Sequence, residues 1–308
     1  LGLTALPAHL VIIGGGYIGL EYAQAFRRFG SEVTIVERGP QIMGREDRDI
    51  ADEALKILGG EGIRVLLDTE TQRVARHANG IEITVRYDGA SETIAGSHLL
   101  VAAGRRPNSD GLNLEAAGVA VDARGTITVD DHLQTNVPGI WALGDIRNPL
   151  QLKHLANREA DIVGHNLTHP DDLRRIDESA VPHVVFSHPE VAQVGRSEEA
   201  LQALGHPYLV GRRDYGATAY GWAMEDQVGF AKVLVDPDTR LILGAHIIGH
   251  EASLLIQPLA QAMALGNTAD DVARTVIYPH PALSEVVEQL LLEVPYTPSR
   301  GGEFEPWE

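Results

Sequence analysis

The sequence predicts an α/β protein that begins with a strand–helix–strand unit and ends with an α+β domain. An apolar run, HLVII at residues 9–13, leads into three glycines, a helical pattern over residues 19–30 and a second apolar run over residues 33–36. Farther along the chain, runs of strand type surround helical patterns. With 308 residues, 44% of them hydrophobic, the chain is long enough for two or three globular domains.

The remaining elements follow from the same patterns. After the first unit we expect a helix at residues 48–58, strands at 63–67, around the alternating apolar positions 81–85, at 99–104 and at 139–145, and a helix at 154–167. The polar and charged segment from Thr168 to Ser179 predicts a domain linker. Beyond it, HVVF, FAKVLVD and LILGAHIIG predict strands, and residues 197–204, 251–265 and 283–293 predict helices.

Composition argues against several classes of function. The net charge of −18 is spread along the chain and disfavours nucleic acid and anionic membranes as partners. The most apolar stretch, residues 10–20, contains four glycines and is too short to span a bilayer. No cysteine is present, which excludes thiolate metal sites and a thiol nucleophile, and we predict no metal site. The lack of a signal-peptide pattern predicts a cytoplasmic protein, and the start at Leu1 suggests the inside of a longer gene.

Gly14, Gly16 and Gly19 form a GxGxxG pattern between the first strand and the first helix. In a dinucleotide-binding unit the first glycine allows the turn, the second admits the pyrophosphate, and the third lets helix and strand pack closely. The pyrophosphate would then lie on the helix N-terminus. Glycine turns after strands are common, so the pattern alone is weak. Its context nevertheless predicts a Rossmann-like dinucleotide-binding domain.

Glu37 supplies that context at the end of the second strand, about twenty residues after the glycines. A carboxylate there accepts hydrogen bonds from the adenosine ribose and repels a 2′-phosphate. The neighbouring Arg38 could reach a 2′-phosphate, although an exposed arginine is more often simply solvated. The sequence therefore favours NAD(H), with NADP(H) as the alternative.

Four ordered segments resemble the class I pyridine nucleotide-disulfide oxidoreductases: GGGYIGLEYAQAFRRFGSEVTIVERG, LLVAAGRRPN, TNVPGIWALGD and HPALSE. The resemblance extends to about Pro295 and implies an FAD-dependent NAD(P)H oxidoreductase that works as a homodimer. It implies an NAD(P)-binding domain at residues 1–105, the C-terminal part of an FAD-binding domain at 106–170, and a dimerisation domain at 180–308. The family's upstream FAD fingerprint and CxxxxC redox disulfide are not in this sequence, so we expect weak or absent FAD binding.

The resemblance also implies roles for single residues near the cofactors. Tyr17 matches an aromatic gate over the flavin, and Glu21 matches an acidic residue beside it. Asp145 matches the aspartate that binds the ribityl chain of FAD. Structural alternatives are packing on the sheet for Tyr17, a solvated carboxylate for Glu21 and a turn residue for Asp145. His154 begins a helix whose positive end faces the flavin in the family, and Gly104, which ends LLVAAG, is a further candidate cofactor contact.

His280 and Glu285 lie five residues apart in YPHPALSEVVEQ, where Pro281 suits a first helical turn. A carboxylate near the imidazole would fix its tautomer and raise its basicity. An isolated pair of this kind is more often without function. In disulfide-reducing members of the family, however, such a pair is the acid–base for the thiols. Tyr278 replaces the first histidine of the family's usual HxHP.

The two halves of the chain resemble different members of the family. VERGPQIMGRED is similar to mercuric reductase-like flavoproteins, whereas RDYGATAYGWAMED and LKHLANREA are similar to mycothione reductases. The His–Glu pair and the absence of cysteine favour a small, mycothione-like disulfide over mercury. Dihydrolipoamide dehydrogenase is the NADH-using alternative. A hypothesis of another class is a non-catalytic, dinucleotide-binding and dimer-forming fragment.

Overall fold

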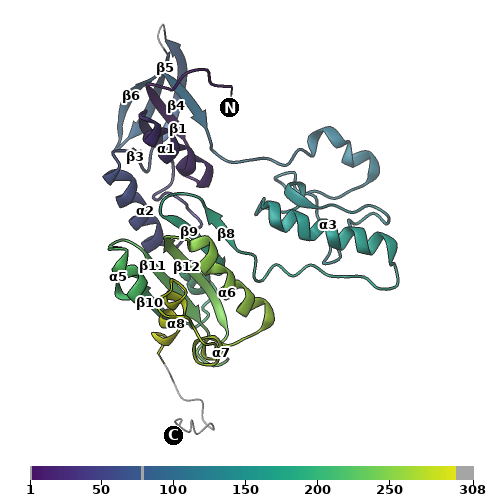
Figure 1. Cartoon of the computed structure of the whole chain (residues 1–308). Coiled ribbons are helices and arrows are strands. Elements are labelled where there is room, and N and C mark those ends of the chain that lie inside the picture. The colour runs from purple at the N-terminus through teal and green to yellow at the C-terminus, as the bar shows by residue number, and fades with distance from the viewer. Residues whose placement is uncertain (1, 78–79, 296–308) are drawn as a thin grey trace. The chain divides into compact units, whose positions relative to one another are not determined.

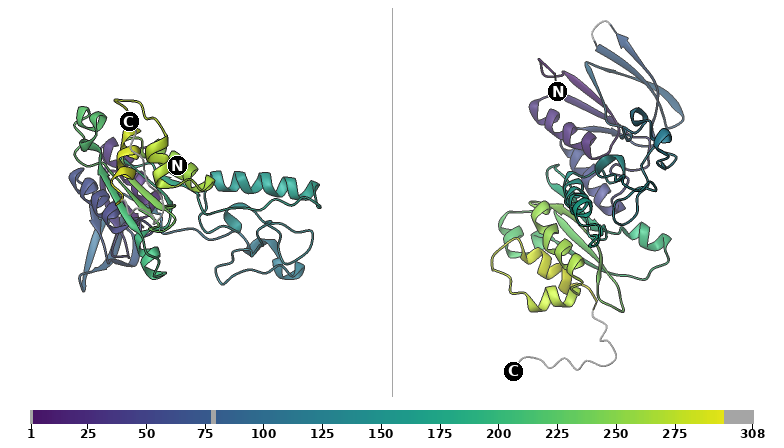
Figure 2. Two further views of the ribbon diagram at one scale, coloured as in Figure 1. Left: turned by 90° about the horizontal axis from the view of Figure 1, so that it is seen from below. Right: turned by 90° about the vertical axis from the view of Figure 1, so that its right-hand side faces the viewer.

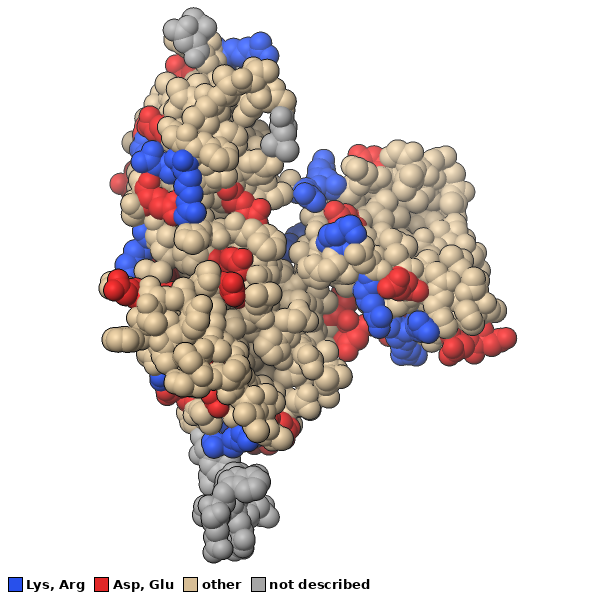
Figure 3. All heavy atoms as spheres, in the orientation of Figure 1, with Lys and Arg blue, Asp and Glu red and all other residues tan. Residues whose placement is uncertain are grey.

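The computed structural model describes residues 2–77 and 80–295, which form two compact units (Figure 1). Unit 1 joins the residues up to Ala103 with those from Pro182 onward, and unit 2 comprises Gly104–Val181. Residues 296–308 of the expected dimerisation domain lie outside the described residues. None of the helices in the described ranges combines the length and apolar character of a membrane span. On the face in Figure 3, acidic and basic side chains are interspersed.

A four-stranded parallel sheet of order β3-β2-β1-β7 forms the N-terminal part of unit 1. Its strands are β1 His9–Ile13, β2 Glu32–Val36, β3 Arg64–Leu66 and β7 His98–Val101, and its helices are α1 Tyr17–Phe29 and α2 Arg48–Gly60. Parallel strands that are buried on both faces consist of continuous apolar residues, which explains runs such as HLVII. The predicted Rossmann-like sheet is confirmed, although the strand expected at 99–104 ends at Val101.

The parallel sheet is covered on both faces (Figure 2). Leu10 and Ile12 of β1 pack into the cluster that holds α1 and α2, whereas Val11 between them packs against Ile83 and Val85. These two residues belong to an antiparallel meander formed by β4 Glu70–His77, β5 Gly80–Tyr87 and β6 Ala90–Gly96. The antiparallel strands expected from the alternating apolar positions are therefore confirmed.

The C-terminal part of unit 1 is a five-stranded antiparallel sheet of order β10-β11-β12-β9-β8. Its strands are β8 His183–Val185, β9 Glu190–Gly195, β10 Leu209–Asp214, β11 Phe230–Val235 and β12 Ile242–Gly249. Its helices are α4 Glu198–Ala203, α5 Ala219–Ala223, α6 Ala252–Leu265, α7 Ala269–Thr275 and α8 Glu285–Leu292. Helices α6 and α8 contact this sheet, as Figures 1 and 2 show. Val191, Phe230 and Ile248 on the sheet join the core of α1 and α2, so one apolar core spans both parts.

A buried charged cluster lies in the same interface. The Lys232 Nζ is 2.7 Å from Asp47 Oδ2, 2.7 Å from Asp49 Oδ1 and 2.8 Å from Glu198 Oε1. The Lys232 and Asp47 side chains are each only 3% exposed. Burial alone would lower the pKa of Lys232, but the hydrogen bonds to the three carboxylates outweigh it and raise that pKa. Lys232 therefore remains charged and ties the loop between β2 and α2 to the C-terminal sheet.

Unit 2 contains little regular structure. It has three short 3₁₀ turns, η1 Asp110–Leu112, η2 Leu114–Ala117 and η3 Gly144–Ile146, and one long helix, α3 Lys153–Thr168. The strand predicted at residues 139–145 is wrong, because Trp141 makes only an isolated bridge to Gln134 and the run ends in η3. Beside this bridge Thr135 N donates to Ile140 O and Ala142 N donates to Leu133 O, but the pairing does not continue into a ladder of the kind that defines a strand.

The buried ion cluster generates a stability prediction. Lys232→Met should lower the free energy of unfolding by about 3–5 kcal/mol, because it leaves the buried Asp47 carboxylate without its cation. Urea denaturation followed by circular dichroism measures the change. Lys56→Met is the matched control, since the 74%-exposed Lys56 in its surface pair with Glu53 should contribute less than about 1 kcal/mol. Equal effects of the two substitutions would contradict a buried ion pair at Lys232.

Candidate functional site

Three glycines shape the turn between β1 and α1. Gly14 has a positive φ of 109°, and a Cβ there would lie 2.5 Å from the Ala102 carbonyl oxygen. A Cβ at Gly19 would overlap the Gly14 carbonyl oxygen, so α1 packs on the turn too closely for any side chain. At Gly16, in contrast, no atom lies within 4 Å of the Cβ position. The turn therefore leaves open space at the N-terminus of α1, where a pyrophosphate would fit.

The Glu37 carboxylate is held beside this turn. Gly15 N donates to Glu37 Oε2 at 2.6 Å, and Gly39 N donates to Oε1 at 2.7 Å. An ionised carboxylate accepts about four hydrogen bonds, so capacity remains for ribose hydroxyls. Arg38 is exposed to solvent. The structure thus brings the predicted acid against the glycine turn and leaves the neighbouring arginine outside.

Tyr17, the first residue of α1, contacts the C-terminal part of unit 1. Its hydroxyl donates to Glu46 Oε1 at 2.8 Å, and its ring stacks on His183 with the ring centroids 5.3 Å apart. Burial, followed by the charge of Glu46, strongly raises the pKa of Tyr17, so the phenol stays neutral. Glu21, one turn farther along α1, accepts a hydrogen bond from Phe186 N at 2.9 Å.

Two partners of Tyr17 are missed by sequence reasoning. Glu46 carries a weak signal, because an acidic pair follows two apolar residues in IMGRED. His183 carries none, since a histidine that begins an apolar strand is usually a structural residue. Only the packing of β8 on α1 brings His183 to Tyr17.

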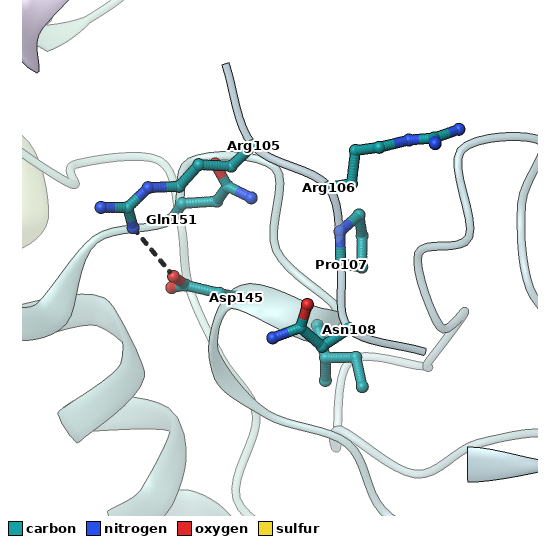
Figure 4. Close-up of a pocket in the computed structure, with 7 residues that line it drawn as sticks. Arg105, Arg106, Pro107, Asn108, Asp145 and Gln151 are labelled. Atoms are coloured by element: carbon teal, nitrogen blue, oxygen red, sulfur yellow. Dashed lines mark hydrogen bonds and ion pairs between the residues drawn. The ribbon is translucent and has the colours of Figure 1, made fainter. Parts of the chain in front are cut away.

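Asp145 lies in a pocket of unit 2 (Figure 4). The lining residues are Arg105, Arg106, Pro107, Asn108, Asp145, Ile146 and Gln151. The Arg105 guanidinium points at Asp145, with Nη1 3.4 Å from Oδ2, whereas the Arg106 side chain extends away from it (Figure 4). Gly104, with a φ of 111°, directly precedes Arg105. His154 is exposed in the first turn of α3 and is not among the pocket residues.

The Asp145 turn is supported by a buried carboxylate on α3. Glu159, whose side chain is fully buried, accepts hydrogen bonds from Gly144 N, from Arg147 and from Asn148. Burial alone would lower the pKa of Arg147, but Glu159 and Glu178 outweigh it and raise that pKa. This charged network fixes the backbone that presents Asp145 to solvent.

His280 and Glu285 form the hydrogen-bonded pair that their spacing suggests. His280 Nδ1–H donates to Glu285 Oε1 at 2.7 Å, and Ala282 N donates to Oε2 at 3.0 Å. The imidazole is 70% exposed, whereas the carboxylate is 8% exposed. The hydrogen bond from His280, aided by that from Ala282, lowers the pKa of Glu285. The carboxylate therefore stays ionised and fixes the ring, which leaves Nε2 as the nitrogen that exchanges protons.

The backbone around this pair differs from the expectation. Helix α8 begins at Glu285, so the placement of Pro281 in its first turn is wrong. Glu285 accepts the Ala282 N–H instead, which holds a turn before the helix. The Tyr278 hydroxyl donates to Val272 O at 3.2 Å, and burial raises the pKa of Tyr278 to about 12. Tyr278 thus anchors the segment to α7 as a neutral phenol.

A largely apolar pocket adjoins His280. Its lining residues are Gly216, Ala217, Thr218, Ala219, Tyr220, Trp222, Ala223, His280 and Pro281. Trp222 on α5 is 76% exposed, which is unusual for a large aromatic side chain. In the described ranges, no group of three or more His, Cys, Asp or Glu side chains is placed to hold a metal ion.

Comparisons with known proteins agree with this geometry. Residues 1–160 match the model of the pyridine nucleotide-disulphide oxidoreductase family, and residues 181–291 match the family's dimerisation domain.

Individual relatives are similar over nearly the whole chain. A dihydrolipoyl dehydrogenase of Cupriavidus necator is 39% identical over 96% of this chain and 62% of its own length. A mycothione reductase of Mycobacterium tuberculosis is 41% identical over 94% of this chain and 63% of its own length. The HOCl-induced flavoprotein disulfide reductase RclA from Escherichia coli superposes with a TM-score of 0.83 at 34% identity, over 94% of this chain and 66% of RclA. The chain thus spans just over 60% of the length of these curated relatives, and it belongs to the pyridine nucleotide-disulphide oxidoreductase family.

Proposed function

We propose that this chain supplies the nicotinamide-nucleotide site and the acid–base pair of an FAD-dependent NAD(P)H:disulfide oxidoreductase. The observation that carries the proposal is the glycine turn, which is open at Gly16 and has the Glu37 carboxylate fixed beside it. When bound, the nicotinamide would supply a hydride that the flavin passes to a disulfide.

The nucleotide would be held by the chain's own backbone and one carboxylate. Its pyrophosphate would accept hydrogen bonds from the first N–H groups of α1 above Gly16. The ribose hydroxyls of its adenosine would donate to Glu37, which is already held by Gly15 and Gly39. Because a 2′-phosphate would face this negative charge, the arrangement favours NADH over NADPH.

Residues 106–170 would form the C-terminal part of an FAD-binding domain. The Asp145 carboxylate is exposed in its pocket, where it could accept hydrogen bonds from the ribityl hydroxyls. The first turn of α3, with His154, would place positive helix-dipole charge near a reduced flavin. In the described residues only the turn at Gly14–Gly19 has the form of a pyrophosphate cradle. We therefore expect FAD to bind this chain weakly or not at all.

The disulfide chemistry would use His280 and Glu285. The imidazole Nε2 would protonate a leaving thiolate and later deprotonate a thiol, while Glu285 stabilises the imidazolium. The exposed pair and the neighbouring Trp222 suit a site completed by a second copy through residues 180–308, in an isologous homodimer. We propose a small, mycothione-like disulfide as the acceptor. A dihydrolipoyl acceptor is the second candidate, because Glu37 favours NADH.

The nucleotide site is tested by two glycine substitutions with opposite consequences. Gly16→Ala should leave thermal stability nearly unchanged, since nothing lies near the new Cβ, but should abolish measurable NADH binding in calorimetry. Gly19→Ala should instead destabilise the fold, because its Cβ overlaps the Gly14 carbonyl oxygen. Unimpaired NADH binding by Gly16→Ala would rule out this turn as the pyrophosphate site.

Selectivity between the nucleotides depends on Glu37. The unmodified chain should bind NADH more tightly than NADPH, and Glu37→Ala should remove most of that difference by removing the charge repulsion. Calorimetric titration with both nucleotides measures the ratio of dissociation constants. Glu32→Ala, at the exposed start of β2, is the control and should keep the ratio. Tighter binding of NADPH to the unmodified chain would refute the role of Glu37.

The acid–base role is tested in a protein that joins this chain to an FAD-binding region with a redox disulfide. His280→Gln should leave flavin reduction by NADH nearly intact but slow disulfide turnover by at least about 100-fold, which is typical of a lost general acid–base. Stopped-flow absorbance of the flavin and steady-state turnover separate the two steps. The control is His250→Gln, which changes an exposed histidine outside the pair. Undiminished turnover by His280→Gln would exclude the proposed role.

A further inference from the structure

The pocket beside His280 is built from two segments that are far apart in the sequence. One side is formed by residues 216–223, called here the α5 wall, which includes Thr218 and Trp222. The other side is formed by His280 and Pro281, which lie in the turn before α8. The width of the pocket therefore depends on how each segment is held to the sheet beneath it.

Tyr215 holds the α5 wall to the C-terminal sheet. Its side chain is fully buried, its N–H donates to Gly229 O at 2.8 Å, and its hydroxyl donates to His250 O at 3.2 Å. The Thr218 hydroxyl donates to Tyr215 O at 2.8 Å, and a Cβ at Gly221 would overlap that same oxygen. The wall is thus packed on Tyr215 with no space to move closer to the sheet.

Arg213 on β10 connects this wall to α8. Its Nη2 donates to the Ala217 carbonyl oxygen in the wall, and its Nη1 donates to Glu293 Oε1 at 3.0 Å, at the C-terminal end of α8. Arg213 Nε is buried and has no hydrogen-bond partner among the described residues. Because an unpaired buried N–H is costly, the two Nη contacts determine how the guanidinium lies. A planar guanidinium holds two acceptors in fixed directions, which a lysine ammonium cannot do.

Helix α8 transmits this contact to the acid–base pair. The helix packs closely on β10, since a Cβ at Gly211 would lie 2.6 Å from Leu290 O. Its first residue is Glu285, whose carboxylate orients His280. A helix of eight residues is short and stiff, so a contact that fixes its end also fixes its start.

We propose that Arg213 is a positioning residue that sets the distance between the α5 wall and His280, and thereby the fit of a disulfide acceptor between them. The inference rests on the proposed function in that His280 is the acid–base for a disulfide bound in this pocket. Arg213 is not one of the residues that line the pocket. It acts through Ala217 on one side and through Glu293 on the other.

The bridge itself is tested on this chain by fluorine NMR after incorporation of 5-fluorotryptophan. The signals of Trp222 and Trp141 are assigned by their loss in Trp222→Phe and Trp141→Phe. Arg213→Met keeps an apolar stem but removes both contacts, so it should shift or broaden the Trp222 signal and leave the Trp141 signal unchanged. Arg64→Met, which removes a partly exposed ion pair with Glu92, is the matched control and should change neither signal. A role in stability alone would not move the Trp222 signal of the folded chain.

The role in acceptor binding is tested in a protein that joins this chain to an FAD-binding region with a redox disulfide. Arg213→Met should raise the KM for mycothione or lipoamide by about five- to tenfold, a change within reach of one lost hydrogen bond to a charged group. Because Glu285 still fixes His280, kcat should fall by less than about twofold and keep its pH dependence. Flavin reduction by NADH should be unchanged, and Arg213→Lys should give an intermediate KM.

A double variant shows whether Glu293 acts through Arg213. Glu293→Gln weakens one of the two contacts and should raise KM less than Arg213→Met does. The double variant Arg213→Met/Glu293→Gln should have the same KM as Arg213→Met alone, because Glu293 then has no partner left to lose.

The possible contrary results have different meanings. An unchanged Trp222 signal in Arg213→Met would show that Arg213 does not hold the wall, and the inference would fail while the proposed function stood. A moved signal with an unchanged KM would show that the acceptor does not depend on the wall, which also overturns the inference. A joined protein that reduces neither disulfide would refute the proposed function, and with it the role of Arg213 in acceptor binding.

Discussion

Unit 1 depends on the partners of two buried carboxylates in the loop between β2 and α2. Asp47 is paired with Lys232 on β11, and Glu46 is bonded by Tyr17 on α1 and by His183 on β8. Buried carboxylates without such partners would cost several kilocalories per mole, so the loop holds both parts of the unit together. The same loop supports the glycine turn, because Met43 N donates to Gly15 O at 2.9 Å. Nucleotide site and domain interface therefore share one structural element.

The parts of the fold that follow from local chemistry could be predicted from the sequence. The glycine turn is an example, because Gly14 and Gly19 are required by backbone contacts within the unit itself. The pairing of His280 with Glu285 is another, since a five-residue spacing brings the two side chains together within one turn and helix start. The roles that the family resemblance assigns to Tyr17, Glu21, Gly104, Asp145 and His154 remain proposals.

What could not be predicted depends on distant partners. An apolar run such as residues 139–145 forms a strand only where another strand lies beside it, and the sequence does not contain that information. Likewise, the contacts of Tyr17 with Glu46 and with His183 require α1, the loop after β2 and β8 to meet. The error at Pro281 is local instead, because the Glu285 carboxylate accepts the Ala282 N–H in a turn that precedes α8, and the helix begins only at Glu285.

The insertion of unit 2 between the two parts of unit 1 also affects the order of events during synthesis. Asp49 and its partner Lys232 are separated by 183 positions. At about 5–20 residues per second, a ribosome needs roughly 10–40 s to add that length of chain. During this interval the emerging N-terminal sheet carries solvated acids and an uncovered apolar face on α1 and α2. The apolar core shared with the C-terminal sheet can form only after β11 and β12, which contribute Phe230 and Ile248, have been synthesised.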